Sequence, residues 1–302
     1  MDRPTVVVVG SLHYDVMVDA PDRPRKGETV TGYSWRPKFG GKGGNQAIAA
    51  AKAGANTKFA GAVGDDEFGR FLLAALAGGG VDTSKVARVT DSGSGMSVAI
   101  SDDGGDYGAV IVSGANLKVD PTAMAVPELW QDARVLILQN EMPEPINIAA
   151  ARSAKAAGAI VCVNAAPYRL MSQDFSSLID VLVVNSIEAE ELCGVQVTDL
   201  ASAALAADSL SALFKTVIVT AGGEGVVGLE RGSDPISLRA LPVKLISTHG
   251  AGDVFVGTLA AALASNQPFS GCISAANKAA ALHVSTPARM TTSREISLTS
   301  QQ

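Results

Sequence analysis

The sequence predicts an α/β fold in which a mostly parallel central sheet is flanked by helices and a small β-sheet projects from it. Short apolar runs alternate along the chain with longer segments of helical periodicity. The runs are apolar throughout, as in strands that are buried on both faces of a parallel sheet. Two polar segments interrupt this order and indicate the second sheet.

Six apolar runs and six helical segments predict the central layers. The expected strands lie at 6–9, 58–62, 135–138, 160–163, 181–184 and 217–220. The expected helices lie at 46–53, 67–77, 145–157, 200–213, 254–263 and 272–283. Sheets of this kind bind ligands at the carboxyl ends of their strands, so residues that follow the runs are the first candidates for a site.

The small sheet is predicted at 12–38 and 93–114. The first segment is polar and rich in proline and glycine, with short strands suggested around Asp15, Val16, Val18, Thr29 and Val30. The second alternates around the turn 102–106 and predicts a β-hairpin. A sheet beside the strand ends is suited to act as a lid. We therefore expect one domain, 1–302, with a lid, and a poorly ordered polar segment in the last ten residues.

Composition and charge limit the classes of function. The chain has 302 residues, of which 47% are hydrophobic, and a formal net charge of −6. Such a chain can bury a large core and is not expected to be disordered. It lacks the basic footprint of a nucleic-acid partner, so an anionic substrate would need a local positive site.

Neither a membrane nor a secretory role is expected. No segment approaches about 18 uninterrupted apolar residues, which argues against a transmembrane helix. The run 6–9 is too short for a signal peptide, so we expect a cytoplasmic protein. Cys162, Cys193 and Cys272 lack metal-ligand spacing and are expected to be reduced core residues.

The most informative stretch is 248–253, which reads THGAGD. A Gly-x-Gly turn at a helix start leaves backbone N–H groups free to bind an anion. A carboxylate would repel a phosphate that is merely bound there. Asp253 fits better as a base that takes a proton from a hydroxyl attacking a phosphoryl group. The loop indicates a kinase, although one loop is a weak signal.

A second glycine-rich turn, 40–47, reads GGKGGNQA. Its glycines allow the backbone to approach a ligand, and a helix beginning at Gln46 would present its N-terminus there. The spacing matches neither a P-loop nor a dinucleotide fingerprint. A flexible turn is the simpler interpretation of the glycines alone. Lys42 and Asn45 favour recognition of a polar ligand.

Two carboxylates follow predicted strands. Asp15 could accept hydrogen bonds from adjacent sugar hydroxyls, although a solvated turn aspartate is the simpler interpretation. Glu141, after the predicted strand 135–138, could be a strand-end carboxylate in a cleft or a loop charge. His13, His249 and His283 do not form a metal set, and we assign no chemical role to His249.

Two further strand ends carry polar or glycine-rich sequence. Asn185 and Glu188 could hold a hydrated Mg²⁺, or they could cap a helix as N-cap and N3, and both can be true. Residues 220–225 read TAGGEG and fit either a nucleotide wall or a hairpin turn.

Taken together, these motifs resemble the ribokinase-like carbohydrate kinases over nearly the whole chain, and within that family the ribokinases most. Both glycine signatures are present in the right order, with 24–29, 61–66 and 113–116 as finer similarities. The resemblance implies a Rossmann-like central domain, a β-sheet lid often used for dimerisation, and ATP-dependent transfer to a sugar hydroxyl with Mg²⁺.

The resemblance also implies residue roles. Asp253 would be the base, with the amides of Gly250, Ala251 and Gly252 as an anion hole. The positions around the sugar would be His13, Asp15, Gly41, Lys42, Asn45, Glu141 and Asp253. The nucleotide positions would be Asn185, Thr220, Gly222, Gly225, Gly252 and Asn277. Glu188 and Asn185 would order the Mg²⁺ through water.

Two positions depart from the family pattern. His13 stands where ribokinases usually carry Asn, and its imidazole is bulkier and can reverse its hydrogen-bonding sense. Ser247 stands where many have an Asp that helps to hold an activating K⁺, so K⁺ activation should be small or absent.

The expected acceptor is the primary hydroxyl of a pentose, with D-ribose giving ribose 5-phosphate as the first candidate. A nucleoside kinase of ribonucleoside or pseudouridine type and a hexose kinase are the alternatives within the family. A catalytically silent sugar sensor is the non-enzyme alternative, and the intact Asp253 speaks against it. A nicotinamide oxidoreductase is disfavoured because no G-x-G-x-x-G follows the first strand. The partners are then ATP, the sugar or nucleoside, and a second copy joined through the lid.

Overall fold

The structure, a computed structural model, describes residues 3–104 and 106–286. Within this part of the chain, a nine-stranded central sheet has the order β13-β12-β11-β10-β9-β8-β1-β4-β5. Its strands are β1 (Thr5–Val9), β4 (Asn56–Gly64), β5 (Val81–Val89), β8 (Ala133–Gln139), β9 (Ile160–Asn164), β10 (Val181–Asn185), β11 (Thr216–Thr220), β12 (Gly225–Glu230) and β13 (Ile236–Arg239). Pairing is parallel from β11 to β5, and β12 and β13 add antiparallel strands at one edge.

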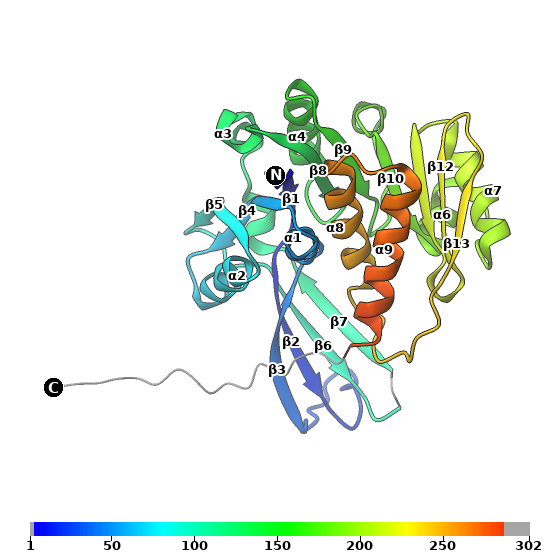
Figure 1. Ribbon diagram of the computed structural model, residues 1–302. Coiled ribbons are helices and arrows are strands. Elements are labelled where there is room, and N and C mark those ends of the chain that lie inside the picture. Colours follow the sequence, from blue (N-terminus) through cyan, green and yellow to red (C-terminus); the bar gives the residue numbers. More distant parts are fainter. Residues whose placement is uncertain (1–2, 105, 287–302) are drawn as a thin grey trace.

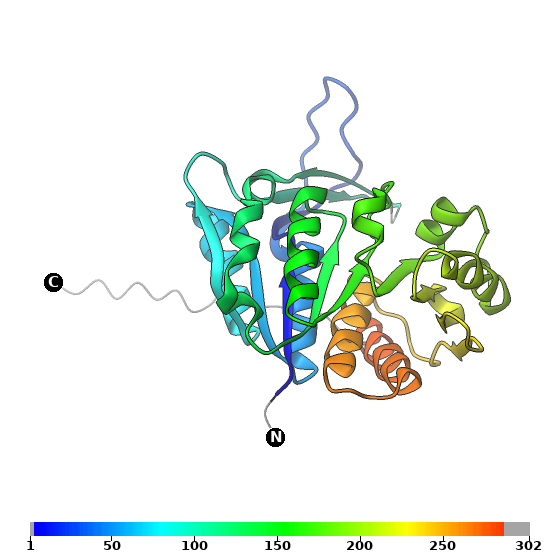
Figure 2. The same cartoon turned by 90° about the horizontal axis from the view of Figure 1, so that it is seen from above.

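Helices cover both faces of the sheet (Figures 1 and 2). One face carries α1 (Lys42–Lys52), α2 (Glu67–Gly78), α8 (Ala251–Ala264) and α9 (Phe269–Val284). The other carries α4 (Glu144–Ala156), α5 (Gln173–Ser176), α6 (Ser186–Cys193) and α7 (Leu200–Ser211). The remaining short helices are α3 (Pro127–Trp130), η1 (Gly114–Lys118), η2 (Pro121–Ala125) and η3 (Gly222–Glu224).

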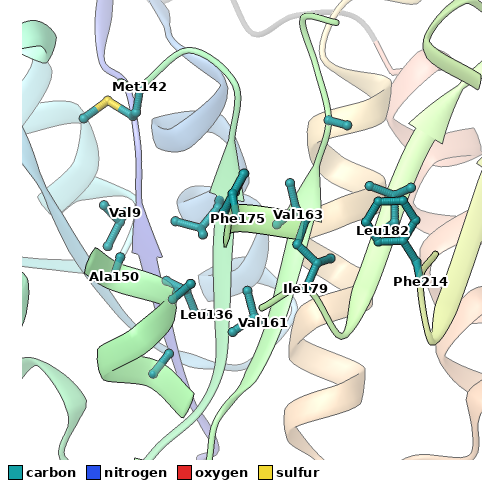
Figure 3. Close-up of a cluster of buried hydrophobic side chains, with 14 of the residues drawn as sticks. Val9, Leu136, Met142, Ala150, Val161, Val163, Phe175, Ile179, Leu182 and Phe214 are labelled. Atoms are coloured by element: carbon teal, nitrogen blue, oxygen red, sulfur yellow. The ribbon is translucent and has the colours of Figure 1, made fainter. Parts of the chain in front are cut away.

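The alternation of side chains along a strand explains the two cores. Val7 and Val9 of β1 point into the cluster beneath α4 to α7, and Val6 and Val8 point into the cluster beneath α1, α2, α8 and α9. Figure 3 shows the first cluster, which also contains Phe175 of α5. A strand buried on both faces needs apolar side chains at every position, which is the pattern seen in the sequence.

The predicted strands and helices of the central layers are confirmed, with one important boundary difference. Helix α1 begins at Lys42, four residues before the predicted start at Gln46. The first turn contains Gly43 and Gly44, which read as loop in the sequence. A Cβ at position 43 would lie 2.6 Å from the Ser11 amide nitrogen, so glycine lets this turn pack directly on the end of β1.

Strands β5, β12 and β13 were not predicted. β5 reads VDTSKVARV and lies at one edge of the sheet, where polar residues face solvent. β12 and β13 lie at the other edge and pair antiparallel. The edge strands β5 and β13 lack the continuous apolar run that marks a buried parallel strand. β12 is a buried strand between β11 and β13, and its apolar run is interrupted by Gly228.

A separate small sheet is formed by β2 (His13–Asp19), β3 (Ser34–Gly40), β6 (Met96–Ser101) and β7 (Tyr107–Val112), in the order β3-β2-β6-β7. It projects from the lower side of the main body in Figure 1. The predicted β6–β7 hairpin is confirmed, and β2 joins it in parallel to β6. The strand suggested around Thr29 and Val30 is wrong, because these residues belong to the long loop between β2 and β3.

Three other expectations concern the whole chain. No helix among the described residues is long and apolar enough to cross a membrane. The three cysteines are unpaired, and burial raises the pKa of the Cys162 thiol to about 12. The prediction for the last ten residues falls outside the described part of the chain.

Candidate active site

The order of the central sheet has a switch point between β1 and β8. The chain passes from β1 to β4 on one side and later adds β8 on the other, so the strand order reverses between them. Such a switch point is where open α/β sheets bind ligands. The residues that follow these two strands meet across it, because the Ser11 hydroxyl donates to Glu141 Oε2.

The glycine-rich turn brings the N-terminus of α1 to the same place. Gly41 has a φ of 89°, and a Cβ there would lie 2.7 Å from the Ser11 carbonyl oxygen. The Lys42 amide at the start of α1 donates to Glu141 Oε2 at 2.9 Å. Glu141 therefore binds a helix N-terminus, where a carboxylate is favoured. The structure brings Gly41, Lys42 and Glu141 together.

Helix α8 supplies the predicted base. Gly250 is its N-cap, with a φ of 80°, and Asp253 lies in the first turn with 8% of its surface exposed. Helices α1 and α8 lie next to each other. The side-chain amides of Asn45 and Gln46, near the start of α1, both donate to the Asp253 carboxylate. Asn45 Nδ2 lies 3.3 Å from Asp253 Oδ2, and Gln46 Nε2 lies 2.9 Å from Oδ1.

The electrostatic setting of Asp253 is suited to a base. Burial raises its pKa from 3.8 to about 6, and the Glu141 charge acts in the same direction. The Lys42 charge and the hydrogen bonds from Gln46 and Asn45 oppose that rise. A carboxylate with a pKa near 6 is a better proton acceptor than an ordinary one and is still ionised at neutral pH.

The loop before α8 is tied to the end of α9. The Ile246 and Ser247 amides both donate to the Val284 carbonyl oxygen, at 2.8 Å and 3.2 Å. His283 Nε2 lies 2.8 Å from the His249 carbonyl oxygen, which can only accept, so this nitrogen carries the hydrogen. Although His249 is exposed, partial burial of its ring lowers its pKa, and the nearby Lys38 and Lys42 charges add to that effect.

The three amides predicted as an anion hole are not equivalent. The Ala251 amide donates to the Thr248 carbonyl oxygen at 3.2 Å, so it is engaged inside the loop. Gly250 and Gly252 line a cavity of about 190 Å³ together with Asp253 and Lys42. That cavity combines the Lys42 charge and a helix N-terminus, which favour an anion, with the Asp253 and Glu188 carboxylates, which oppose one.

The small cavity adjoins a larger one of about 770 Å³. The two share Asn185, Thr220 and Gly252. The larger cavity is also lined by the other predicted nucleotide positions, Gly222, Gly225 and Asn277, and by apolar side chains such as Val243 and Phe255. Asn277 is held by a hydrogen bond of 2.9 Å from its Nδ2 to the Arg239 carbonyl oxygen. All six predicted nucleotide positions therefore line one cavity.

Asn185 and Glu188 form the capping box that the sequence allowed. The Asn185 amide donates to Glu188 Oε2 at 2.8 Å, and the Glu188 amide donates to Asn185 Oδ1 at 2.9 Å. Glu188 is buried, lines the small cavity, and has a raised pKa because of that burial. Among the residues that the structure describes, no three His, Cys, Asp or Glu side chains lie close enough together to hold a metal ion.

His13 and Asp15 lie on β2 of the small sheet, away from the small cavity. Asp15 Oδ1 accepts a hydrogen bond of 2.6 Å from the Ser97 hydroxyl. A Cβ at Gly40 would lie 2.0 Å from Asp15 Oδ2, so only glycine fits beside this carboxylate. His13 is 4% exposed, and within the described residues its Nε2 has no hydrogen-bond partner.

Several polar residues of the site were not singled out from the sequence. They are Ser11, which binds Glu141; Gln46, which binds Asp253; Ser97, which binds Asp15; and Asn164, which lines the small cavity. Gln46 and Asn164 had a usable signal, because one belongs to the glycine signature and the other ends a buried strand. No sequence signal distinguishes Ser11 and Ser97 from other serines in loops or strands.

Comparisons with known proteins show the family to which the chain belongs. A model of the pfkB family carbohydrate kinases matches residues 3–295. The chain belongs to this family. Its members are phosphotransferases that use ATP and act on a sugar hydroxyl, so the chain is an enzyme of that class.

Relatives with known names match most of the chain. The ribokinase of Haemophilus influenzae is 34% identical over 284 residues, which cover 93% of this chain and 92% of the relative. The ribokinase of Bacillus subtilis is 32% identical over 280 residues, which cover 92% of both. The solved structure of Arabidopsis thaliana ribokinase complexed with ribose and ATP superimposes with a TM-score of 0.88 at 30% identity, covering 95% of this chain and 94% of that one.

Proposed function

We propose that this protein is an ATP-dependent kinase that phosphorylates the primary hydroxyl of a pentose, with D-ribose, giving ribose 5-phosphate, as its substrate. The observation that carries the proposal is the buried Asp253 carboxylate, which lies between the glycine-rich turn of α1 and the small cavity. The names of the similar ribokinases and the ribose-and-ATP complex of the Arabidopsis protein support the choice of substrate.

Each part of the site has a role in this proposal. Asp253 accepts the proton of the attacking hydroxyl, as its pKa of about 6 allows. The amides of Gly250 and Gly252 and the Lys42 charge stabilise the negative charge that develops on the transferred phosphoryl group. The amide of Ala251 holds the turn that orients the other two. Little covalent chemistry is asked of the protein beyond this positioning.

The sugar is placed by residues from both sheets. Asp15, with one oxygen fixed by Ser97, accepts hydrogen bonds from sugar hydroxyls, and Asn45 donates beside Asp253. Glu141 fixes the Gly41–Lys42 turn, so that it shapes the pocket as well as contacting the sugar. The small sheet would serve as the lid of a single domain, because it carries two of the proposed sugar positions, His13 and Asp15.

ATP and Mg²⁺ belong to the two cavities. The larger cavity would hold the nucleotide, and Asn185, Thr220 and Gly252, which line both cavities, would contact its phosphates. The donor set fits a hydrated Mg²⁺, because Glu188 is a buried carboxylate whose charge a cation would stabilise. Glu188 and Asn185 would hold such an ion through water, where it would neutralise charge on the phosphates. Ser247 offers no carboxylate to a monovalent ion, so strong K⁺ activation is not part of the proposal.

A homodimer through the small sheet completes the proposal. Its outer strands expose large apolar side chains, among them Trp35 at 66%, Val110 at 68% and Val112 at 51%. Exposed apolar patches of this kind mark interaction surfaces. Sedimentation velocity distinguishes a dimer from a monomer whose small sheet folds onto its own domain.

The substrate is tested with a panel of acceptors. We expect ATP-dependent ADP release with ribose at a higher kcat/KM than with deoxyribose, other pentoses, fructose or ribonucleosides. A nucleoside is the second candidate, because Asp15 would bind the hydroxyls of its ribose moiety in the same way. A higher kcat/KM with a ribonucleoside would select that alternative, and no ADP release with any acceptor would select the silent sensor.

A further inference from the structure

Gln46 lies in α1, and its side chain has no exposed surface. Its Nε2 donates to Asp253 Oδ1 at 2.9 Å, which is a good distance for an amide and a charged acceptor. The other atom of the amide, Oε1, has no partner among the described residues. The orientation of the amide is therefore set by Asp253 alone, because turning it over would place Oε1 against a carboxylate oxygen.

This contact depends on an unusually close crossing of α1 and α8, which lie side by side in Figure 1. Gly257 is one helical turn after Asp253, on the face of α8 that meets α1. A Cβ there would lie 2.5 Å from the Gln46 carbonyl oxygen and 2.6 Å from Ala49 Cβ. Glycine at this position lets the two backbones approach so closely that the Gln46 side chain reaches Asp253.

Asn45 and Gln46 donate to different oxygens of the Asp253 carboxylate, and the two contacts differ in length and in exposure. Asn45 Nδ2 is 3.3 Å from Oδ2 and Asn45 is only half-buried, so a substrate hydroxyl can compete for that oxygen. The Gln46 contact to Oδ1 is shorter and closed off from solvent. Oδ1 is thus held by a buried hydrogen bond, while Oδ2 is left available for proton transfer.

We propose that Gln46 is the positioning residue of Asp253: it fixes the carboxylate in the orientation from which Oδ2 receives the proton, and it keeps that carboxylate ionised at neutral pH. The inference rests on the proposed role of Asp253 as base. Gln46 does not touch the substrate in this scheme and acts only through Asp253.

The need for such a residue follows from the charges around Asp253. Burial and the Glu141 carboxylate favour the protonated form, whereas the Lys42 charge and the Gln46 and Asn45 amides favour the ionised form. Lys42 also lines the cavity assigned to the phosphates, so bound ATP would compete with Asp253 for its positive charge. Gln46 has no such competing partner, so its contribution persists whether or not ATP is bound.

The first test is the pH profile of the Gln46→Leu variant, which keeps the side-chain volume and removes the donor. A hydrogen bond to a charged group is worth enough to shift a pKa by about one to two units. We expect the acidic limb of kcat/KM for the sugar to move up by about one to two pH units. We also expect kcat at its optimum to fall about 10- to 100-fold with little change in the KM for ATP, since misplacing a reacting group lowers the rate of chemistry.

A matched control is Thr57→Val, which removes from β4 a buried hydroxyl that has no hydrogen-bond partner in the described part of the chain. It should leave the pH profile unchanged. Gln46→Glu serves as the second variant if leucine impairs folding, which circular dichroism and thermal melting report. A carboxyl group beside Asp253 should also move the acidic limb upward, because two carboxyl groups in contact cannot both ionise easily.

The second test does not depend on turnover. The Asp253 carboxyl carbon is followed by ¹³C NMR through a pH titration of the full-length protein, assigned with Asp253→Asn. We expect its midpoint to rise by about one to two pH units in Gln46→Leu. An unchanged midpoint and an unchanged acidic limb would overturn the role of Gln46. A shifted midpoint in a protein that phosphorylates no acceptor would instead overturn the proposed function and leave the Asp253–Gln46 coupling standing.

Discussion

Acidification should inactivate this enzyme at a pH where an ordinary aspartate would still be ionised. Asp253 must be deprotonated to act as a base, and its pKa is raised from 3.8 to about 6, chiefly by burial. Its ionised fraction is then about 0.9 at pH 7 and about 0.1 at pH 5, whereas a pKa of 3.8 would leave about 0.9 ionised at pH 5. We expect kcat/KM for the acceptor to fall about tenfold between pH 7 and pH 5.

The assay is initial-rate ADP release at saturating ATP and limiting sugar, because kcat/KM for the sugar then reports the protonation state before the sugar binds. A second titrating group lies close by, since His249 has a lowered pKa and gains a proton as the pH falls. The variant His249→Gln is therefore the matched control and should keep the acidic limb. A kcat/KM that stays level from pH 7 to pH 5 would refute the reasoning about Asp253.

Four further predictions follow from the same region. Asp253→Asn should lower kcat about 10²–10⁴-fold while still binding ATP in calorimetry, which is the usual scale for a lost general base. The same variant should be more stable than the wild type at pH 7.5 in urea, by up to about 3 kcal/mol, because an ionised buried carboxylate destabilises the fold. With Ser247 in place of a carboxylate, K⁺ should change the rate less than about twofold in a Na⁺-free buffer. Gly257→Ala should destabilise the fold by about 1–3 kcal/mol in urea melts, because its Cβ would lie 2.5 Å from a backbone oxygen of α1.

The sign of the stability prediction can be checked separately. The folded-state pKa of Asp253 is raised, so its protonated form is favoured by folding, and this contribution is present below about pH 4 and lost as the pH rises through about 6. The stability gap between Asp253→Asn and the wild type should therefore close toward pH 4, and a gap that is independent of pH would contradict the linkage.

The other predictions have their own controls. Near-wild-type turnover of Asp253→Asn would remove the assigned base, and several-fold activation by K⁺ would show that other oxygens hold the ion without a carboxylate at position 247. Gly78→Ala is the control for Gly257→Ala, since a Cβ at Gly78 in α2 would meet nothing within 4 Å. It should be neutral or slightly stabilising.

The central layers were predictable because a strand buried on both faces is apolar at every position. Val6 to Val9 of β1 show the pattern directly, with side chains on both faces of the strand inside a core. β5 escaped prediction because it is an edge strand whose polar residues resemble a loop. The start of α1 escaped it for a different reason, since glycines inside a first turn read as loop and are explained only by the packing of that turn on β1.

The grouping of the site was predictable, but the partners of each residue were not. Strand-end positions such as Asn185 and Thr220 had to share one edge of a parallel sheet, and they line the same cavity. Sequence does not reveal which buried amide faces which carboxylate, so Gln46 was passed over beside Asn45. The engagement of the Ala251 amide by Thr248 is likewise decided by the curvature of one loop.

The junction between the small sheet and α1 has a mechanical consequence. β3 ends at Gly40 and α1 begins at Lys42, so Gly41 alone separates the projecting sheet from the helix that carries the contacts to Asp253. A linker of one residue does not let the sheet move independently of the helix. Rotation of the sheet can be absorbed only at Gly41, or else it turns the first residues of α1 and shifts the amides that hold the base. The orientation of the projecting sheet and the orientation of the Asp253 carboxylate are therefore coupled through Gly41.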